Sequence, residues 1–198
     1  MKLFVSHISA LRYWRREEGL GDSVRARITS LNSAIGNVKD AKQLDPTTHG
    51  LIMGIEHPLN VLICRKEDRR YARSLKPRVW REGLPYNAFR RIAPNLYVSS
   101  PEFVFVQMSA QLSVVELAQL GNELCGGYFL RSTTGFEEHI NKKPLTTHTK
   151  LVNFVKSVPN ARGAQKALNA LRWVANHCNS PMETNSLLML CLPGRTGG

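Results

Sequence analysis

The clearest hydrophobic periodicity lies in the second half of the chain, where apolar residues recur at helical spacing. One such stripe consists of Val114, Leu117, Ala118, Gly121 and Leu124. Ser113 and Glu116 have the Ser-x-x-Glu spacing of a capping box, and a Gly-Gly pair at 126–127 supplies a stop. This combination of stripe, cap and stop predicts a helix between Ser113 and the glycines.

Similar patterns predict further helices. We expect one over residues 7–18 with Ser9 as its cap, and one over 23–35 with Val24 and Ile28 on its apolar face. Ser100 and Pro101 have the types preferred at a helix start, and they open a helix over 100–111. The remaining predicted helices cover residues 149–158, residues 160–179 and a final segment that begins at Ser180.

Strand patterns are concentrated in the middle of the chain. Short apolar runs at residues 50–55, 59–64 and 95–100 have the length of strands, and residues 78–85 alternate with a period of two. The sequence therefore predicts an α+β fold with three parts. These are an N-terminal helical segment (1–50), a small β-rich basic module (51–99) and a helical C-terminal half (100–198).

Charge adds a second feature to this picture. The chain has 27 Lys and Arg residues against 15 Asp and Glu, a formal net charge of +12. Such an excess favours an anionic partner, most often nucleic acid. The densest basic run supplies the predicted phosphate contacts, namely Arg65, Lys66, Arg69, Arg70, Arg73, Lys76, Arg78 and Arg81.

Aromatic residues accompany the basic ones in two places. Tyr71 and Trp80 lie within the basic run and are candidates for stacking on bases, unless Trp80 belongs to the core. The segment at 12–16, Arg-Tyr-Trp-Arg-Arg, is the second cluster. There we expect Trp14 to pack in the core, and we expect Tyr13 and Trp14 not to be buried together.

Other chemistry has little support in the sequence. The four cysteines, Cys64, Cys125, Cys178 and Cys191, lie far apart, and we expect reduced, buried thiols and no metal site. The sequence contains no Gly-x-Ser-x-Gly elbow and no glycine-rich phosphate loop, so no cofactor is predicted. No secretory signal and no apolar stretch of membrane-spanning length is present, so we expect a cytoplasmic protein without membrane association.

Several segments occur in an order that resembles one bacterial family. They are "FVSHISALRYW", "LNVLICRKEDRR" with "RVWREGLP", the block from "NLYVSSPE" to "GNELCG", and "SPMETNSLLMLCLP". Together they resemble the abortive-infection type IV antitoxin-like (AbiEi-like) proteins, many of which carry a C-terminal very-short-patch-repair-type endonuclease domain. The resemblance spans nearly the whole chain, and "SPMET" is its most specific motif.

The resemblance gives Glu183 a second interpretation. In that family Ser-Pro-Met-Glu-Thr opens the first helix of a PD-(D/E)XK nuclease core, and the matching acid here is Glu183. The later Asp and Glu-x-Lys strands of that core do not occur within residues 184–198. The resemblance thus implies a truncated or stand-alone member without catalysis. Local physics alone explains Glu183 as part of a Ser180–Glu183 capping box.

We therefore expect a non-catalytic prokaryotic nucleic-acid-binding protein of an antiviral defence or toxin–antitoxin system. The alternative is a protein-interaction module, or an inhibitor of a defence system, that does not bind DNA. This alternative rests on the apolar run in the last helix. There the predicted contacts to a protein partner or a second copy are Leu187, Leu188, Leu190 and Leu192.

Overall fold

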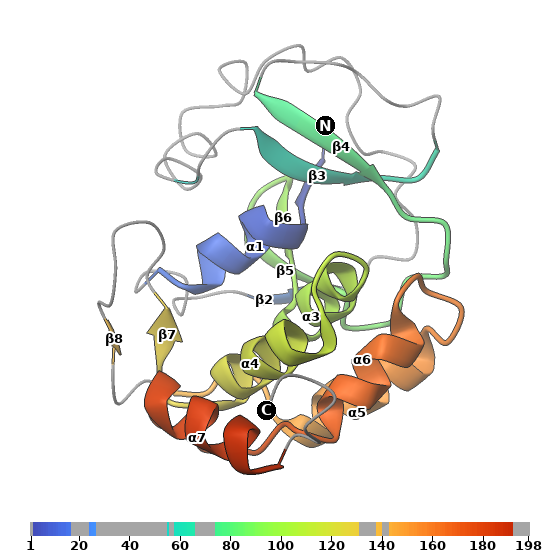
Figure 1. The fold of residues 1–198 in the computed structure, drawn as a ribbon. Helices are drawn as coiled ribbons and strands as arrows, with labels where there is room; N and C mark the ends of the chain where they lie inside the picture. Colours follow the sequence, from blue (N-terminus) through green and yellow to red (C-terminus); the bar gives the residue numbers. More distant parts are fainter. Residues whose placement is uncertain are drawn as a thin grey trace. The chain divides into compact units, whose positions relative to one another are not determined.

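The computed structural model describes residues 2–16, 24–26, 55, 58–65, 74–130, 138–139 and 143–191. The chain divides into two compact units, Met1–Val104 and Phe105–Gly198. The first is built around a β-sheet and the second mainly from helices (Figure 1). The fold is α+β, as the sequence predicts.

The sheet of the first unit contains six strands among the described residues, in the order β2-β5-β6-β1-β3-β4 (Figure 1). In chain order the strands are β1 (Leu3–Val5), β2 (Val24–Ala26), β3 (Leu59–Ile63), β4 (Leu75–Val79), β5 (Phe89–Ala93) and β6 (Leu96–Ser99). The pairs β1–β6 and β3–β4 are parallel, and the other pairs are antiparallel. Among the strands that the structure describes, β4 is therefore at one edge of this sheet, next to the buried strand β3.

The core of the first unit forms where β1 lies between β6 and β3. All three residues of β1 are buried, and the ring of Phe4 lies 4.9 Å from that of Phe89 and 5.0 Å from that of Tyr97. Helix α1 (His7–Trp14) follows at once. Its Trp14 is buried as expected, and Trp14 Nε1 donates to the Ser99 carbonyl at 2.7 Å. The aromatic clustering explains why this short strand is fixed in the centre of the sheet.

Three predictions for the N-terminal segment were wrong. Tyr13 and Trp14 are buried together, because their rings meet edge to face at 5.2 Å. Helix α1 begins at His7 as predicted, but its N-cap is Ser6 and not Ser9, whose hydroxyl accepts from Asn60 of β3. Residues 24–26 form a strand instead of a helix, since they pair antiparallel with β5.

The helices of the second unit begin largely where the sequence predicts. Helix α3 (Pro101–Ser109) starts after Ser100, whose hydroxyl accepts from the Phe103 N–H at 3.3 Å, and the division between the units falls within it. Helix α4 (Val114–Cys125) has the predicted capping box of Ser113 and Glu116. The remaining elements are β7 (Phe129–Leu130), β8 (Glu138–His139), α5 (His148–Ser157), α6 (Ala164–Leu171) and α7 (Pro181–Cys191).

Helix α4 is central to this unit, because α6 and α7 both pack against it and α5 packs on α6 (Figure 1). The helix predicted over 160–179 is shorter than expected, since α6 ends at Leu171. Asn122, buried in α4, explains this end. Its Nδ2 donates to the Trp173 carbonyl at 3.0 Å, and its Oδ1 accepts from the Ala175 N–H at 2.9 Å. These bonds satisfy backbone groups that leave the helical ladder.

The predicted three-part division differs from the two units in one respect. The sheet takes strands from both sides of residue 50, because β1 pairs with β3 and β6. Residues 1–50 are therefore not a separate helical segment in their described part. The apolar run predicted as a strand over 50–55 lies outside the described residues except for Ile55, which is buried.

Candidate nucleic-acid interface

The predicted basic run flanks and includes the edge strand β4. Lys76 and Arg78 lie on β4, Arg65 follows β3, and Arg81 follows β4. We call these four residues the basic edge. The other predicted phosphate contacts lie outside the described residues, and they are Lys66, Arg69, Arg70 and Arg73.

The parallel pairing of β3 and β4 fixes how the basic edge is arranged. Ile63 and Val79 are register partners, so Arg65 and Arg81 each come two residues after a paired position, at the same end of the two strands. Both are exposed, as is Lys76. Side chains alternate along a strand, so Lys76 and Arg78 share one face of β4. Lysine on a sheet edge also discourages pairing with another chain, and this role would explain Lys76 without a ligand.

Arg78 differs from the other three because it is half-buried and hydrogen-bonded. Its Nε donates to Asn60 Oδ1 on β3 at 2.9 Å. The Asn60 Nδ2 donates to Ser9 Oγ on α1 at 3.2 Å, and the Asn60 backbone N–H donates to the same oxygen at 2.9 Å. Ser9 and Asn60 are both buried. Neither residue was predicted from the sequence to have this role, although an asparagine inside an apolar strand is a signal that a partner is needed.

His7 lies beside this network at the start of α1. It has a φ of 53°, a left-handed conformation that few residues other than glycine adopt, and its Nδ1 lies 3.0 Å from Ser6 Oγ. Burial and the positive charge of Arg78 lower the pKa of His7 to about 3. The imidazole is therefore neutral at pH 7, and Arg78 supplies the positive charge at this position.

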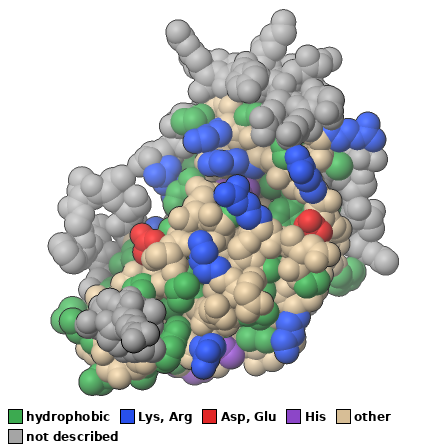
Figure 2. All heavy atoms as spheres, turned by 45° about the vertical axis from the view of Figure 1, so that its right-hand side comes forward, with side chains coloured by type: hydrophobic (Ala, Val, Ile, Leu, Met, Phe, Trp, Pro, Cys, Tyr) green, Lys and Arg blue, Asp and Glu red, His purple; other side chains and the backbone are tan. Residues whose placement is uncertain are grey.

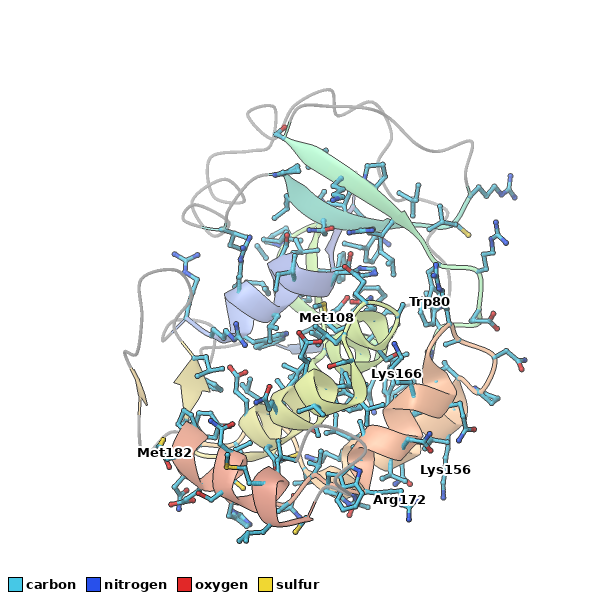
Figure 3. All side chains as sticks on the ribbon, in the orientation of Figure 1. Trp80, Met108, Lys156, Lys166, Arg172 and Met182 are labelled. Atoms are coloured by element: carbon cyan, nitrogen blue, oxygen red, sulfur yellow. The ribbon has the colours of Figure 1, made fainter. Side chains whose placement is uncertain are left out.

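Trp80, the aromatic candidate for base stacking, already makes contacts within the protein. Its ring meets Phe103 edge to face at 4.7 Å, and its Nε1 donates to the Gly83 carbonyl at 3.4 Å. It is half-buried, and Figure 3 shows its position after β4. These contacts favour the core interpretation of Trp80. Tyr71, the other candidate, lies outside the described residues.

Basic side chains also occur in the second unit. In the segment predicted as a helix over 160–179, Arg162 and Arg172 are exposed, whereas Lys166 donates to the Leu112 carbonyl at 2.8 Å. On α5, Lys150 and Lys156 are exposed. Figure 2 shows Lys and Arg side chains scattered over the drawn face, with fewer Asp and Glu side chains among them.

Glu183 occupies the first turn of α7, where it acts as part of a cap. Ser180 Oγ accepts from the Glu183 N–H at 3.1 Å, as the capping box predicts. The carboxylate accepts from the Asn179 N–H at 2.8 Å, one residue before the expected position. Glu183 is exposed. The described residues contain no group of three His, Cys, Asp or Glu side chains placed to hold a metal ion.

The apolar residues of α7 separate into a buried and an exposed set. Leu188 is 3% exposed and packs within the second unit, while Leu187 is half-buried. Leu190 is 87% exposed, and Met189 and Met182 are 78% and 69% exposed. Figure 3 labels Met182 near the start of this helix. Leu192 lies outside the described residues. Leu188 is thus not available as a surface contact, whereas Leu190 is.

The structure describes all four cysteines and joins none of them in a disulfide, as expected. Cys125 and Cys178 are buried, and burial raises the pKa of the Cys178 thiol. The expectation of burial was wrong for the other two. Cys191 is exposed at the end of α7, and Cys64 is half-buried directly after β3, because each lies where its element leaves the core.

Comparison of the chain with protein-family models, with curated proteins and with solved structures found no match. The resemblance to AbiEi-like proteins therefore stays a prediction. Among the described residues, no helix has the length and apolar character needed to cross a membrane.

Proposed function

We propose that this chain binds nucleic acid through the basic edge and does so without catalysis. The observation that carries the proposal is the arrangement of Lys76, Arg78 and Arg81 along and beyond the edge strand β4. Arg65 adds a fourth cation at the same end as Arg81. Cations that neutralise phosphates release counterions, which is the main source of sequence-independent affinity for DNA or RNA.

The sequence between β3 and β4 contains the other predicted cations of the basic run. Residues 66–73 connect Arg65 to the segment that enters β4, and they include Lys66, Arg69, Arg70 and Arg73. The same stretch also contains two acids, Glu67 and Asp68, and Glu82 follows Arg81.

The biological setting is proposed from the sequence resemblance. We propose a role in antiviral defence or a toxin–antitoxin pair, as a relative of AbiEi-like proteins. The capping bonds of Glu183 support a structural rather than a catalytic part for that acid.

A salt titration with matched variants tests the binding surface. The affinity for a mixed-sequence DNA duplex is measured between about 50 and 200 mM salt for wild type and for Lys76→Ala/Arg81→Ala. The slope of log K against log salt should fall by about two, because each lost phosphate contact contributes about 0.9. The control is Lys150→Ala/Lys156→Ala, which removes two exposed lysines of α5. An equal fall in both doubles would reject the basic edge as the site.

The exposed residues of α7 favour a second candidate, a protein-interaction module. Leu190 and Met189 leave large apolar side chains in water, each of which forgoes roughly 1.5 to 3 kcal/mol of burial. If this surface contacts a partner or a second copy, Leu190→Arg abolishes a dimer detected by light scattering and leaves DNA affinity unchanged. If wild type and variant are both monomers, self-association through this surface is excluded.

A further inference from the structure

Arg78 has an environment unlike that of the other cations of the basic edge. Its Nε is bonded to Asn60 Oδ1, whereas Lys76, on the same face of β4, is exposed. A guanidinium is a planar fork of five N–H donors, so a bond through Nε fixes the plane of the group. The Nη1 and Nη2 ends then point away from Asn60, and neither donates to another described residue.

Asn60 is itself held in one orientation. A guanidinium only donates hydrogen bonds, so the Asn60 atom that faces Arg78 must be Oδ1. The amide nitrogen then faces Ser9 Oγ, at 3.2 Å, and the Asn60 backbone N–H reinforces this contact at 2.9 Å. Turning the amide over would leave buried polar groups unpaired. The direction of the Arg78 fork is therefore set by two buried residues before any ligand arrives.

The charge at this position is positive and not neutralised by a described carboxylate. Arg78 forms no ion pair among the described residues, and the titratable group that interacts with it is His7. The His7 imidazole is neutral at pH 7, so it does not add a competing charge. A guanidinium edge whose Nη1 and Nη2 groups bond to no other described residue matches two oxygens of a phosphate, which is the arrangement that gives bidentate recognition.

We propose that Arg78 binds a backbone phosphate of the nucleic acid through its Nη1 and Nη2 groups, with Asn60 and Ser9 as positioning residues. This inference rests on the proposed function and deepens it. Arg65, Lys76 and Arg81 act as point charges, whereas Arg78 is a contact of defined geometry. Such a contact fixes where the phosphate backbone lies against β4 without reading the base sequence.

The test replaces the fork while keeping its charge. In Arg78→Lys the cation remains, but the planar pair of donors and the bond to Asn60 are lost. We expect the dissociation constant for a mixed-sequence duplex to rise about tenfold or more, with the salt slope unchanged. The matched control is Arg172→Lys, an exposed arginine of the second unit, which should bind as wild type does.

Asn60→Ala tests the positioning role. It should reproduce the Arg78→Lys signature, a weaker affinity with the same slope, because the charge is still present but its direction is not fixed. The Nε–H signal of Arg78 in a nitrogen–proton NMR spectrum provides an independent readout, since its hydrogen bond disappears in this variant. If Asn60→Ala does not fold, Arg78→Lys decides the question alone, because lysine keeps the aliphatic stem and the charge.

The outcomes separate the two proposals. If wild type binds the duplex and Arg78→Lys binds equally tightly, Arg78 is a point charge and the inference is wrong while the proposed function stands. The inference is equally wrong if Arg78→Lys and Arg172→Lys weaken binding to the same extent. If wild type shows no affinity at about 50 mM salt, the proposed function fails and the inference fails with it.

Discussion

The carboxylate of Glu183 accepts a hydrogen bond from the backbone N–H of Asn179 at 2.8 Å. The Glu183 N–H in turn donates to Ser180 Oγ, so Glu183 is bonded to both of the residues that precede α7. Both bonds satisfy backbone N–H groups at the start of the helix, where these donors have no intrahelical partner. The residue that the family resemblance places in a nuclease core thus has a complete structural role.

The first prediction concerns this cap. Ser180→Ala should lower the free energy of unfolding by about 1 kcal/mol in urea denaturation, because the Glu183 N–H loses its acceptor. Ser186→Ala, at an exposed position of the same helix, is the control and should change stability by less than about 0.5 kcal/mol. A catalytic role would have another signature, namely Mg²⁺-dependent cleavage of duplex DNA that is lost in Glu183→Gln.

The second prediction is a pH dependence from His7. Its pKa is about 3 in the folded chain and about 6.5 when unfolded, so between these values the unfolded state binds more protons. Stability is therefore fully present above pH 6.5 and is lost as the pH falls towards 3. The titration of His7 changes the free energy of unfolding by at most about 1.4 kcal/mol per pH unit.

His7→Asn provides the comparison for that slope. Asparagine does not titrate and tolerates the positive φ of this position. The difference in unfolding free energy between wild type and His7→Asn should shift in favour of the variant as the pH falls from 6.5 to 3. A difference that is constant over this interval would show that His7 titrates normally.

The third prediction concerns the buried amide of Asn122. In Asn122→Leu the Trp173 carbonyl and the Ala175 N–H lose their partners, and a buried unsatisfied group costs about 1 to 3 kcal/mol. The expected loss of unfolding free energy is about 2 to 5 kcal/mol. Asn153→Leu, at an exposed position of α5, should have an effect below about 0.5 kcal/mol. Similar values for the two variants would contradict the role of Asn122 in ending α6.

The fourth prediction contrasts two leucines of α7. Leu188→Ala should lower the free energy of unfolding by about 2 to 5 kcal/mol, because it removes a buried side chain from the second unit. Leu190→Ala should leave it within about 0.5 kcal/mol, because that side chain is already in water. Equal losses measured by denaturation of the two variants would mean that Leu190 is buried in solution, by a partner copy or by the chain.

The sequence predicts best those elements whose signals are local. Helices α3 and α4 begin after Ser100 and Ser113 as expected, because the cap and the first turn lie within three residues of each other. The strand at 59–63 is also where the apolar run places it. In these segments the side chains that decide the structure are neighbours in the sequence.

Elements decided by distant partners could not be predicted in this way. Residues 24–26 belong to a segment, 23–35, whose apolar residues have helical spacing, yet they pair with β5. The strand β5 was not predicted at all, because Arg90 and Arg91 interrupt its apolar pattern, and it forms between β2 and β6. Strand pairing outweighs local propensity in such cases.

In the candidate site, too, local features were predicted from the sequence and those that depend on distant partners were not. The basic run is visible in the sequence, and four of its residues lie on or beside β4. The special position of Arg78 could not be predicted, because it depends on Asn60 and on Ser9, which lie far from it in the sequence and meet it only through the β3–β4 register and the packing of α1.

The most direct test of the central claim is to map the nucleic-acid contact residue by residue. Backbone amide shifts of the full chain are recorded by NMR as a mixed-sequence DNA duplex is added at about 50 mM salt. The largest changes should occur over residues 75–82 and at Arg65, with the amides of α5 and α7 unchanged. Changes confined to the second unit, or no change at all, would contradict binding through the basic edge.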